Sequence, residues 1–264
     1  RIFGGIGIGI ASNLSPMYIA EVSPSHVRGK FVSINQLTIV LGILAAQFVN
    51  WLIAEPVVPG ENILETWNGQ MGWRWMFWAE VVPSALFFIL IFFIPESPRW
   101  LATKLQYGKA ENILSHIGGK EYAKKEIESI KTVISATKEK LNIRMLFQGK
   151  IPGILLIGIV IAAFQQWCGL NVVFNYAQEI FAAAGYGVSD ILFNIVVTGV
   201  TNVIFTFVGM YTVDKLGRRS LMLFGASGLA IIYIIMGICY YLNITGMAVL
   251  IMVVLAIACY AMTL

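Results

Sequence analysis

The chain of 264 residues has few charged side chains. Asp, Glu, Lys and Arg together make up only 12% of it, whereas soluble domains carry roughly 25%. Hydrophobic residues make up 58%, and the mean hydropathy is +0.78. This composition excludes an ordinary soluble globular domain and predicts an integral membrane protein.

Reactive side chains are also scarce, which excludes several kinds of site. The three cysteines, Cys168, Cys239 and Cys259, lie in apolar stretches without the spacing of metal ligands. We interpret them as small core residues. The two histidines, His26 and His116, lie in expected loops, and no Ser-His-Asp or Cys-His arrangement is visible. The sequence therefore predicts no enzyme, no metal site and no cofactor.

The net charge of +4 comes from basic residues that are concentrated in one segment. Of the 18 Lys and Arg residues, 11 lie between Arg99 and Lys150, whereas residues 55–72 contain neither Lys nor Arg. Basic loops of membrane proteins stay on the cytoplasmic side, so residues 99–150 are expected to be cytoplasmic and residues 55–72 external. This placement argues against nucleic acid as a partner.

Long apolar runs fill the rest of the sequence. A helix needs about 20 apolar residues to cross a bilayer. Seven candidate spans reach about this length: residues 2–22, 31–54, 73–94, 151–178, 190–213, 220–242 and 246–264. The predicted fold class is therefore an all-α, polytopic transmembrane helix bundle. Residue 1 already stands at the head of a span and Leu264 lies inside one, so we expect a fragment.

The spans divide the chain into three parts. Residues 1–98 contain three spans and residues 151–264 contain four. Between them, residues 99–150 carry Ile127, Ile130, Ile134 and Leu141 at helical spacing among Lys and Glu. This pattern predicts a cytoplasmic amphipathic helical linker; a plain charged linker is the alternative.

The fourth span carries a cluster of polar side chains. Residues 151–178 form an uncharged run of 28 residues that includes Gln165, Gln166, Asn171, Asn175 and Tyr176. Side-chain amides are costly to bury in hydrocarbon unless they find partners. We therefore expect this helix to line a polar cavity, as the substrate wall of a transporter.

Four motifs occur in a fixed order along the chain. They are Phe3-x-Gly5-Ile6-x-x-Gly9 with Tyr18, Glu21 and Arg28; Pro95-Glu96-Ser97-Pro98-Arg99-Trp100; Gln165-Gln166 with Gly169, Asn171 and Tyr176; and Asp214-Lys215-Leu216-Gly217-Arg218-Arg219. On these motifs the chain resembles the sugar porters of the major facilitator superfamily, in particular bacterial proton-coupled xylose and glucose transporters. The resemblance implies twelve helices in two six-helix halves, of which this chain would hold about seven, helices four to ten.

The resemblance also implies a function. It predicts a secondary active transporter that carries a monosaccharide with a proton by alternating access. The expected partners are the sugar, the proton and the lipid bilayer, and the expected protein is a monomer with several spans in a bacterial inner membrane. Two alternatives stay open: a facilitative sugar uniporter, and a non-transporting sugar sensor on the same fold.

The resemblance assigns sugar contacts to six polar residues: Gln36, Gln165, Gln166, Asn171, Tyr176 and Asn202. Carboxamides suit this role because they donate and accept hydrogen bonds, as sugar hydroxyls do, without placing a charge in the cavity. The alternative use of such amides is hydrogen bonding between neighbouring helices. Ile43 and Asn175 depart from the pattern of relatives, which leaves the choice of sugar open.

The charged residues receive two further roles. Glu80 lies inside the third span, where a carboxylate is a functional hypothesis by default. By resemblance, Glu80 and Arg1 couple transport to the proton, although Glu80 is alternatively a paired structural carboxylate. Seven residues at inner helix ends match a salt-bridge network that gates the family's transporters: Glu21, Arg28, Glu96, Arg99, Asp214, Arg218 and Arg219. Ordinary anchoring by positive charge is the alternative for this group.

Overall fold

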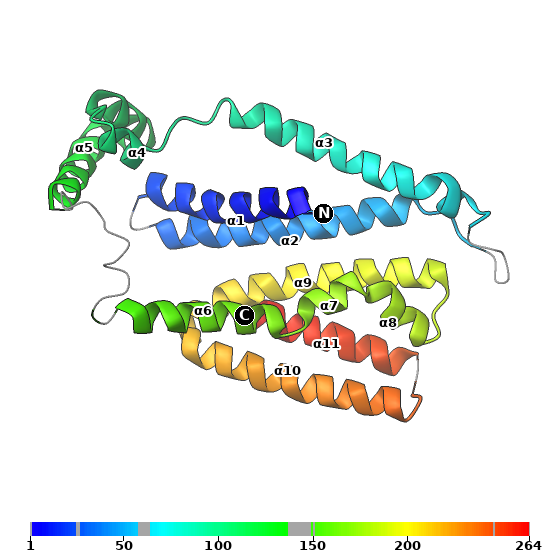
Figure 1. The fold of residues 1–264 in the computed structure, drawn as a ribbon. Helices are drawn as coiled ribbons and strands as arrows, with labels where there is room; N and C mark the ends of the chain where they lie inside the picture. The colour runs from blue at the N-terminus through cyan, green and yellow to red at the C-terminus, as the bar shows by residue number, and fades with distance from the viewer. Residues whose placement is uncertain are drawn as a thin grey trace. The chain divides into compact units, whose positions relative to one another are not determined.

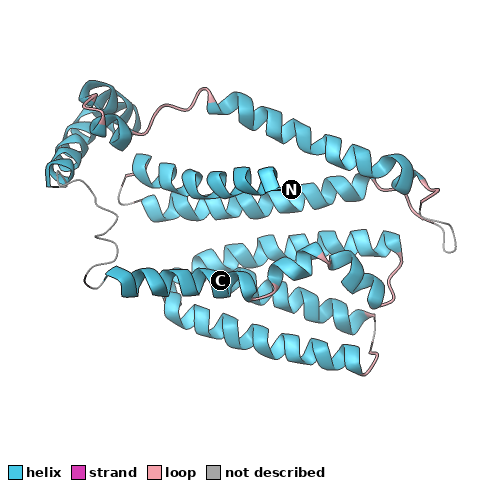
Figure 2. Ribbon diagram, in the orientation of Figure 1, coloured by secondary structure: helices cyan, strands magenta, loops and turns pink. Residues whose placement is uncertain are grey.

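The computed structural model describes residues 2–24, 27–57, 64–136, 149, 151–244 and 246–263, without the side chains of residues 135, 136, 188, 189, 214 and 218. Within these residues every regular element is a helix and no strand occurs (Figure 1 and Figure 2). The helices in chain order are α1 (Ile2–Val22), α2 (Arg28–Ile53), η1 (Asn68–Gly72), α3 (Trp73–Ile91), α4 (Pro98–Thr103), α5 (Tyr107–Ala136), α6 (Ile151–Trp167), α7 (Leu170–Asn175), α8 (Ala177–Ala183), α9 (Val188–Leu216), α10 (Arg218–Tyr241) and α11 (Met247–Thr263).

The membrane-length helices follow the apolar runs of the sequence. Six helical stretches in the described part of the chain are long and apolar enough to cross a membrane, and α11 is a shorter apolar helix. The predicted all-α class is confirmed. Six of the seven expected spans correspond to one helix each, with η1 extending α3 by one turn. The span expected at 151–178 differs, because it is divided among α6, α7 and α8.

The contacts within the chain group it into two units. The first contains residues 1–36 and 88–155, and the second contains residues 37–87 and 156–264. Helices α2, α3 and α6 each contribute to both units. This grouping does not decide the division at residues 98 and 150, which stays a prediction.

The core of the first unit lies between α4 and α5. Ser97 caps α4 by accepting a hydrogen bond from the Trp100 N–H, and Pro98 occupies the first helical position, where its missing N–H costs nothing. Helix α5 consists of two helical segments that meet at Gly119, whose φ of 85° suits glycine. The two segments and α4 share one apolar core, made of Leu101, Ala102, Ala110, Leu114, Ala123, Ile127 and Ile130.

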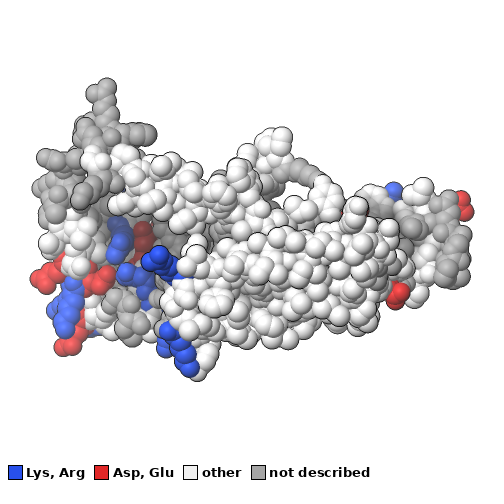
Figure 3. All heavy atoms as spheres, turned by 90° about the horizontal axis from the view of Figure 1, so that it is seen from below, with Lys and Arg blue, Asp and Glu red and all other residues white. Residues whose placement is uncertain are grey.

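A helix therefore runs through the segment expected to be amphipathic. Ile127 and Ile130 are buried in the core, and Ile134 packs partly against it. Leu141 lies outside the described residues. The charged side chains are on the surface of this region: Figure 3 shows red and blue spheres gathered where α4 and α5 lie, whereas the long apolar helices are almost entirely white.

The core of the second unit joins α7 and α8 to α9 and α11. Its buried residues are Leu170, Val173, Ala177, Phe181, Ala184, Ile191, Val249, Val253 and Ile257. Helices α9 and α11 approach closely at Gly209, where a Cβ atom would lie 2.9 Å from the Met262 carbonyl oxygen. On α2, the Trp51 ring lies 6.3 Å from that of Phe193 on α9. These contacts hold α7 and α8 against α9 and α11.

Candidate functional site

The polar span expected at 151–178 contains a break in the helix. Helix α6 ends at Trp167 and α7 begins at Leu170, with Gly169 between them at a φ of 82°. Among the described residues, no backbone carbonyl accepts a hydrogen bond from the Gly169 N–H, which lies between the two helices. Open backbone at membrane depth occurs only where it is buried in protein or lines a water-filled cavity. The break therefore marks the most polar part of this span.

Three of the predicted sugar-binding amides flank this break. Asn171 Nδ2 donates a hydrogen bond of 2.6 Å to Gln166 Oε1, so that a residue of α7 is joined to the last turn of α6. The neighbouring Gln165 side chain is hydrogen-bonded to the phenol of Tyr260 on α11. The Gln166 amino group and the Asn171 carbonyl oxygen stay available, which gives a ligand both donors and an acceptor.

Two tyrosines, Tyr233 and Tyr260, lie next to the break. The Tyr233 hydroxyl of α10 is buried and has no hydrogen-bond partner. A Cβ atom on Gly169 would lie 3.5 Å from that hydroxyl oxygen, and Cys168 and Tyr260 are close enough to interact with it electrostatically. Sequence reasoning missed both tyrosines. They could have been predicted because a tyrosine inside an apolar span carries a hydroxyl group that needs a hydrogen-bond partner when it is buried.

Helix α9 carries a buried polar stripe. Asn194, Thr198, Asn202 and Thr206 recur every four residues, so they lie along one helical face, and each is at most 6% exposed. The threonine hydroxyls donate to backbone carbonyl groups of α9, as Thr206 does to Asn202 at 2.7 Å. The predicted sugar contact Asn202 thus lies in this stripe. Tyr176, at the junction of α7 and α8, is 56% exposed.

The sixth predicted sugar contact lies in the other unit. Gln36 is an exposed residue of α2, and its neighbour Asn35 accepts a hydrogen bond of 2.8 Å from Ser15 of α1. The five other predicted contacts belong to the second unit. A single pocket that contains all six therefore stays a prediction.

The two predicted proton-coupling residues differ in what the structure describes. Glu80 is exposed on α3, and its backbone carbonyl accepts a hydrogen bond of 2.8 Å from Ser84. No residue of α3 is buried within the chain. Arg1 lies outside the described residues. Their role in proton coupling stays a prediction.

Four residues of the predicted gating network lie in the first unit. The Glu21 carboxylate accepts a hydrogen bond from the Ser97 hydroxyl, which joins α1 to the start of α4. No ion pair joins the described residues Glu21, Arg28, Glu96 and Arg99 to one another. Instead, Tyr122 of α5 lies within the electrostatic reach of Arg28 and Arg99. Burial and the Glu126 carboxylate raise the pKa of Tyr122, and the Arg28 and Arg99 guanidinium groups oppose this shift.

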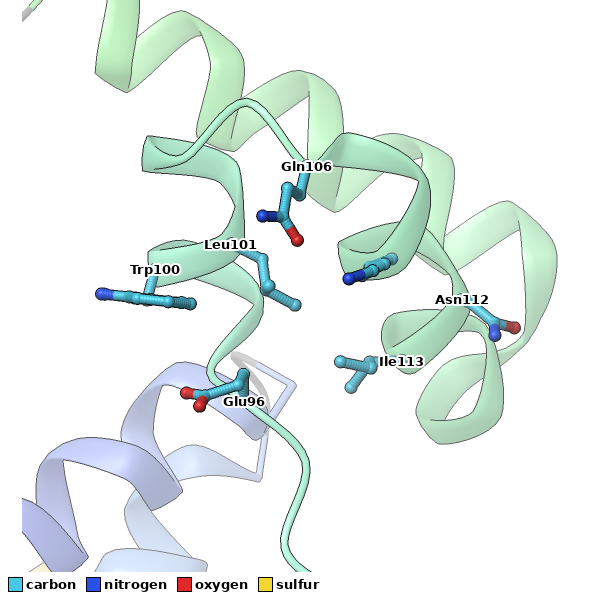
Figure 4. Close-up of a pocket in the computed structure, with 7 residues that line it drawn as sticks. Glu96, Trp100, Leu101, Gln106, Asn112 and Ile113 are labelled. Carbon is cyan, nitrogen blue, oxygen red and sulfur yellow. The ribbon is translucent and has the colours of Figure 1, made fainter.

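Glu96 lies at a pocket between α4 and α5. This pocket has a volume of about 450 Å³ and is lined by Glu96, Trp100, Leu101, Gln106, Lys109, Asn112 and Ile113. Figure 4 shows Glu96 below the Trp100 ring and the Gln106 amide turned toward Leu101. The carboxylate is exposed, so it is accessible to a cation from another element.

The other three gating residues lie where α9 and α10 meet. Asp214 belongs to the last turn of α9, and Arg218 and Arg219 open α10 after Gly217, whose φ is 78°. The Arg219 side chain is exposed, and those of Asp214 and Arg218 are outside the described part of the chain. The gating network as a whole stays a prediction.

Comparison with known proteins adds to this geometry. The family described as "Sugar (and other) transporter" matches residues 1–264. The D-xylose-proton symporter of Escherichia coli strain K12 is 40% identical over 263 residues, which cover 100% of this chain and 52% of that protein. The arabinose-proton symporter of Bacillus subtilis is 36% identical over 255 residues, which cover 97% of this chain and 53% of that protein. The chain thus spans about half the length of these relatives.

The fold is similar to that of a solved transporter structure. The xylose transporter from Escherichia coli, in a partially occluded inward-open conformation, matches with a TM-score of 0.85 and 37% sequence identity. The match covers 100% of this chain and 56% of that one. The fold class is therefore a transmembrane helix bundle of the major facilitator superfamily type, represented here in part.

Proposed function

Because the chain belongs to the sugar (and other) transporter family, we propose that the intact protein carries a monosaccharide together with a proton across the membrane by alternating access. The family is one of transporters rather than enzymes. One observation carries the proposal: Gln166 and Asn171, two neutral carboxamides, are bonded to each other across the helix break at Gly169.

The chemistry of these amides suits a neutral, hydroxyl-rich ligand. Each sugar hydroxyl both donates and accepts a hydrogen bond, and the free groups of Gln166 and Asn171 offer both functions. A charged substrate would instead need an opposite charge in the cavity, and Gln165, Gln166 and Asn171 carry none. The relatives are named for D-xylose and arabinose, so these two pentoses are the first substrates to test.

The remaining parts of the proposal concern the setting and the proton. The membrane-length helices and bacterial relatives make the chain a multi-pass protein of the bacterial inner membrane. We infer that the intact protein is a monomer in lipid, that Glu80 and Arg1 couple sugar movement to the proton, and that the four described gating residues face the cytoplasm. A carboxylate at membrane depth is costly, which supports a functional role for Glu80.

Sugar binding is tested on the full-length protein reconstituted into liposomes. Replacing Asn171 with Ala removes one neutral hydrogen-bonding group, a loss of about 0.5–1.5 kcal/mol, or roughly 2- to 13-fold in affinity. The KM for D-xylose should rise by that factor in Asn171→Ala and Gln166→Ala. Gln178→Ala, an exposed amide of α8, is the matched control and should leave the KM unchanged. Equal KM values in all three variants would contradict sugar binding at the break.

Proton coupling is tested with Glu80→Gln, which keeps the size of the side chain and removes its charge. We expect accumulation of sugar against its gradient to be lost, while exchange of labelled for unlabelled sugar continues. Glu179→Gln, at an exposed carboxylate of α8, should retain both activities. Unchanged accumulation in Glu80→Gln would remove this residue from the coupling mechanism. Specific binding of sugar without uptake or exchange in the wild-type protein would instead favour a sensor.

A further inference from the structure

Tyr233 has the least satisfied side chain around the helix break. It lies on α10, and its hydroxyl is buried without a hydrogen-bond partner. Buried polar groups almost always have a partner, so an unpaired hydroxyl needs an explanation. Phenylalanine would fill the same space without this cost. The hydroxyl therefore has a use in some other state of the protein.

A second group without a partner lies nearby, in the backbone at the break. Among the described residues, no backbone carbonyl accepts a hydrogen bond from the Gly169 N–H, and a Cβ atom on Gly169 would be 3.5 Å from the Tyr233 hydroxyl oxygen. A phenolic oxygen accepts hydrogen bonds from N–H groups. An unpaired donor and an unpaired acceptor thus lie near each other at one junction.

The geometry of the break shows what would produce that displacement. Gly169 has a φ of 82°, so the chain can turn there between α6 and α7. The bond from Asn171 Nδ2 to Gln166 Oε1 holds α7 against the end of α6. A sugar hydroxyl that accepts a hydrogen bond from the Asn171 amide replaces this bond, and α7 is then free to tilt about Gly169.

We propose that Tyr233 is a positioning residue for sugar binding, whose hydroxyl accepts a hydrogen bond from the open backbone at Gly169 when α7 tilts. This inference rests on the proposed function. In the arrangement of the structure the hydroxyl has no hydrogen-bond partner among the described residues, and after α7 tilts it holds α7 in the tilted position. Tyr233 acts on the backbone and not on the sugar.

Tyr240 provides a matched control on the same helix. Its hydroxyl donates a hydrogen bond of 3.1 Å to the Ile180 carbonyl oxygen of α8, so it is already paired in the structure. Tyr233→Phe and Tyr240→Phe each remove one hydroxyl and keep the ring. The two variants therefore separate a hydroxyl that is already paired from one that pairs only when α7 tilts.

The test measures the melting temperature of the full-length protein without sugar, and its KM for the transported sugar. Tyr233→Phe should keep or raise the melting temperature and raise the KM roughly 3- to 10-fold, the effect of one neutral hydrogen bond. Tyr240→Phe should lower the melting temperature and keep the KM. A wild-type KM in Tyr233→Phe overturns the inference, and so does a fall in its melting temperature as large as that of Tyr240→Phe.

The same experiment separates this inference from the proposed function. If the wild-type protein neither binds nor transports D-xylose or arabinose, the proposed function fails, and the inference that rests on it fails too. If the wild-type protein transports a sugar and Tyr233→Phe matches it in KM, only the inference fails.

Discussion

The close approach of α9 to α11 at Gly209 gives a sharp prediction about helix packing. A Cβ atom on Gly209 would lie 2.9 Å from the Met262 carbonyl oxygen, 3.0 Å from that of Ala261 and 3.1 Å from the Met262 Cα atom. All three are backbone atoms, so no side chain can rotate away from an added methyl group. In Gly209→Ala the two helices must therefore separate by a few tenths of an ångström.

Two opposing terms set the size of the effect. Overpacking of a tight contact costs about 1–3 kcal/mol, whereas alanine is favoured over glycine inside a helix by about 1 kcal/mol. Gly209→Ala should therefore lower the free energy of unfolding by roughly 0–2 kcal/mol. Gly237→Ala on α10 is the control, because a Cβ atom there meets nothing within 4 Å. Gly237→Ala should raise the free energy of unfolding by up to about 1 kcal/mol.

The assay is thermal unfolding of the purified full-length protein in detergent, followed by tryptophan fluorescence, with both variants measured beside the wild type. We expect Gly209→Ala to melt below Gly237→Ala. Since Asn202 lies two turns before Gly209 on the same helix, a displaced α9 should also raise the KM for sugar. The packing argument is refuted if Gly209→Ala melts at or above the temperature of Gly237→Ala.

Two further predictions concern the α4–α5 region. Ser97→Ala removes the N-cap of α4 and the donor to Glu21, so the free energy of unfolding should fall by about 1–2 kcal/mol. Ser97→Thr keeps a hydroxyl and should unfold near the temperature of the wild type. Equal melting temperatures of the two variants would contradict the capping role. Gly119→Ala places a Cβ atom on a residue with a φ of 85°, so the free energy of unfolding should fall by about 1–2 kcal/mol. In Gly108→Ala the added Cβ atom has no neighbour within 4 Å, so this variant should be as stable as the wild type or more stable. A stabilised Gly119→Ala would refute the argument from backbone strain.

The helices could be predicted from the sequence because lipid permits few alternatives. Every backbone group in the hydrocarbon needs an internal partner, so an apolar run of sufficient length becomes a helix. The run from 2 to 22 matches α1 residue for residue. At 151–178 the same reasoning gave one helix where there are three, because hydropathy does not register the left-handed backbone at Gly169.

The site was predictable in its residue types and not in its connections. Gln166 and Asn171 were expected to contact sugar because buried amides need partners, but nothing in the sequence indicates that they bond to each other. Tyr260 and Tyr233 were missed because an aromatic ring in an apolar span is usually part of the core. Only the three-dimensional structure shows that the Tyr260 hydroxyl is bonded to Gln165 and that the Tyr233 hydroxyl has no partner among the described residues.

The bond between Gln166 and Asn171 would explain why the proposed sugar site lies at the helix break. In a continuous α-helix, residues five apart point in directions about 140° apart, so these two side chains could not meet. They meet because Gly169 interrupts the helix between them. A ligand shifts a conformational equilibrium only by its differential affinity for the two states. A sugar that replaces this bond, worth about 0.5–1.5 kcal/mol, binds the two arrangements of α7 unequally. In the mechanism we propose, sugar occupancy and the tilt of α7 are coupled through one pair of amides, and closing the break into a regular helix should abolish both together.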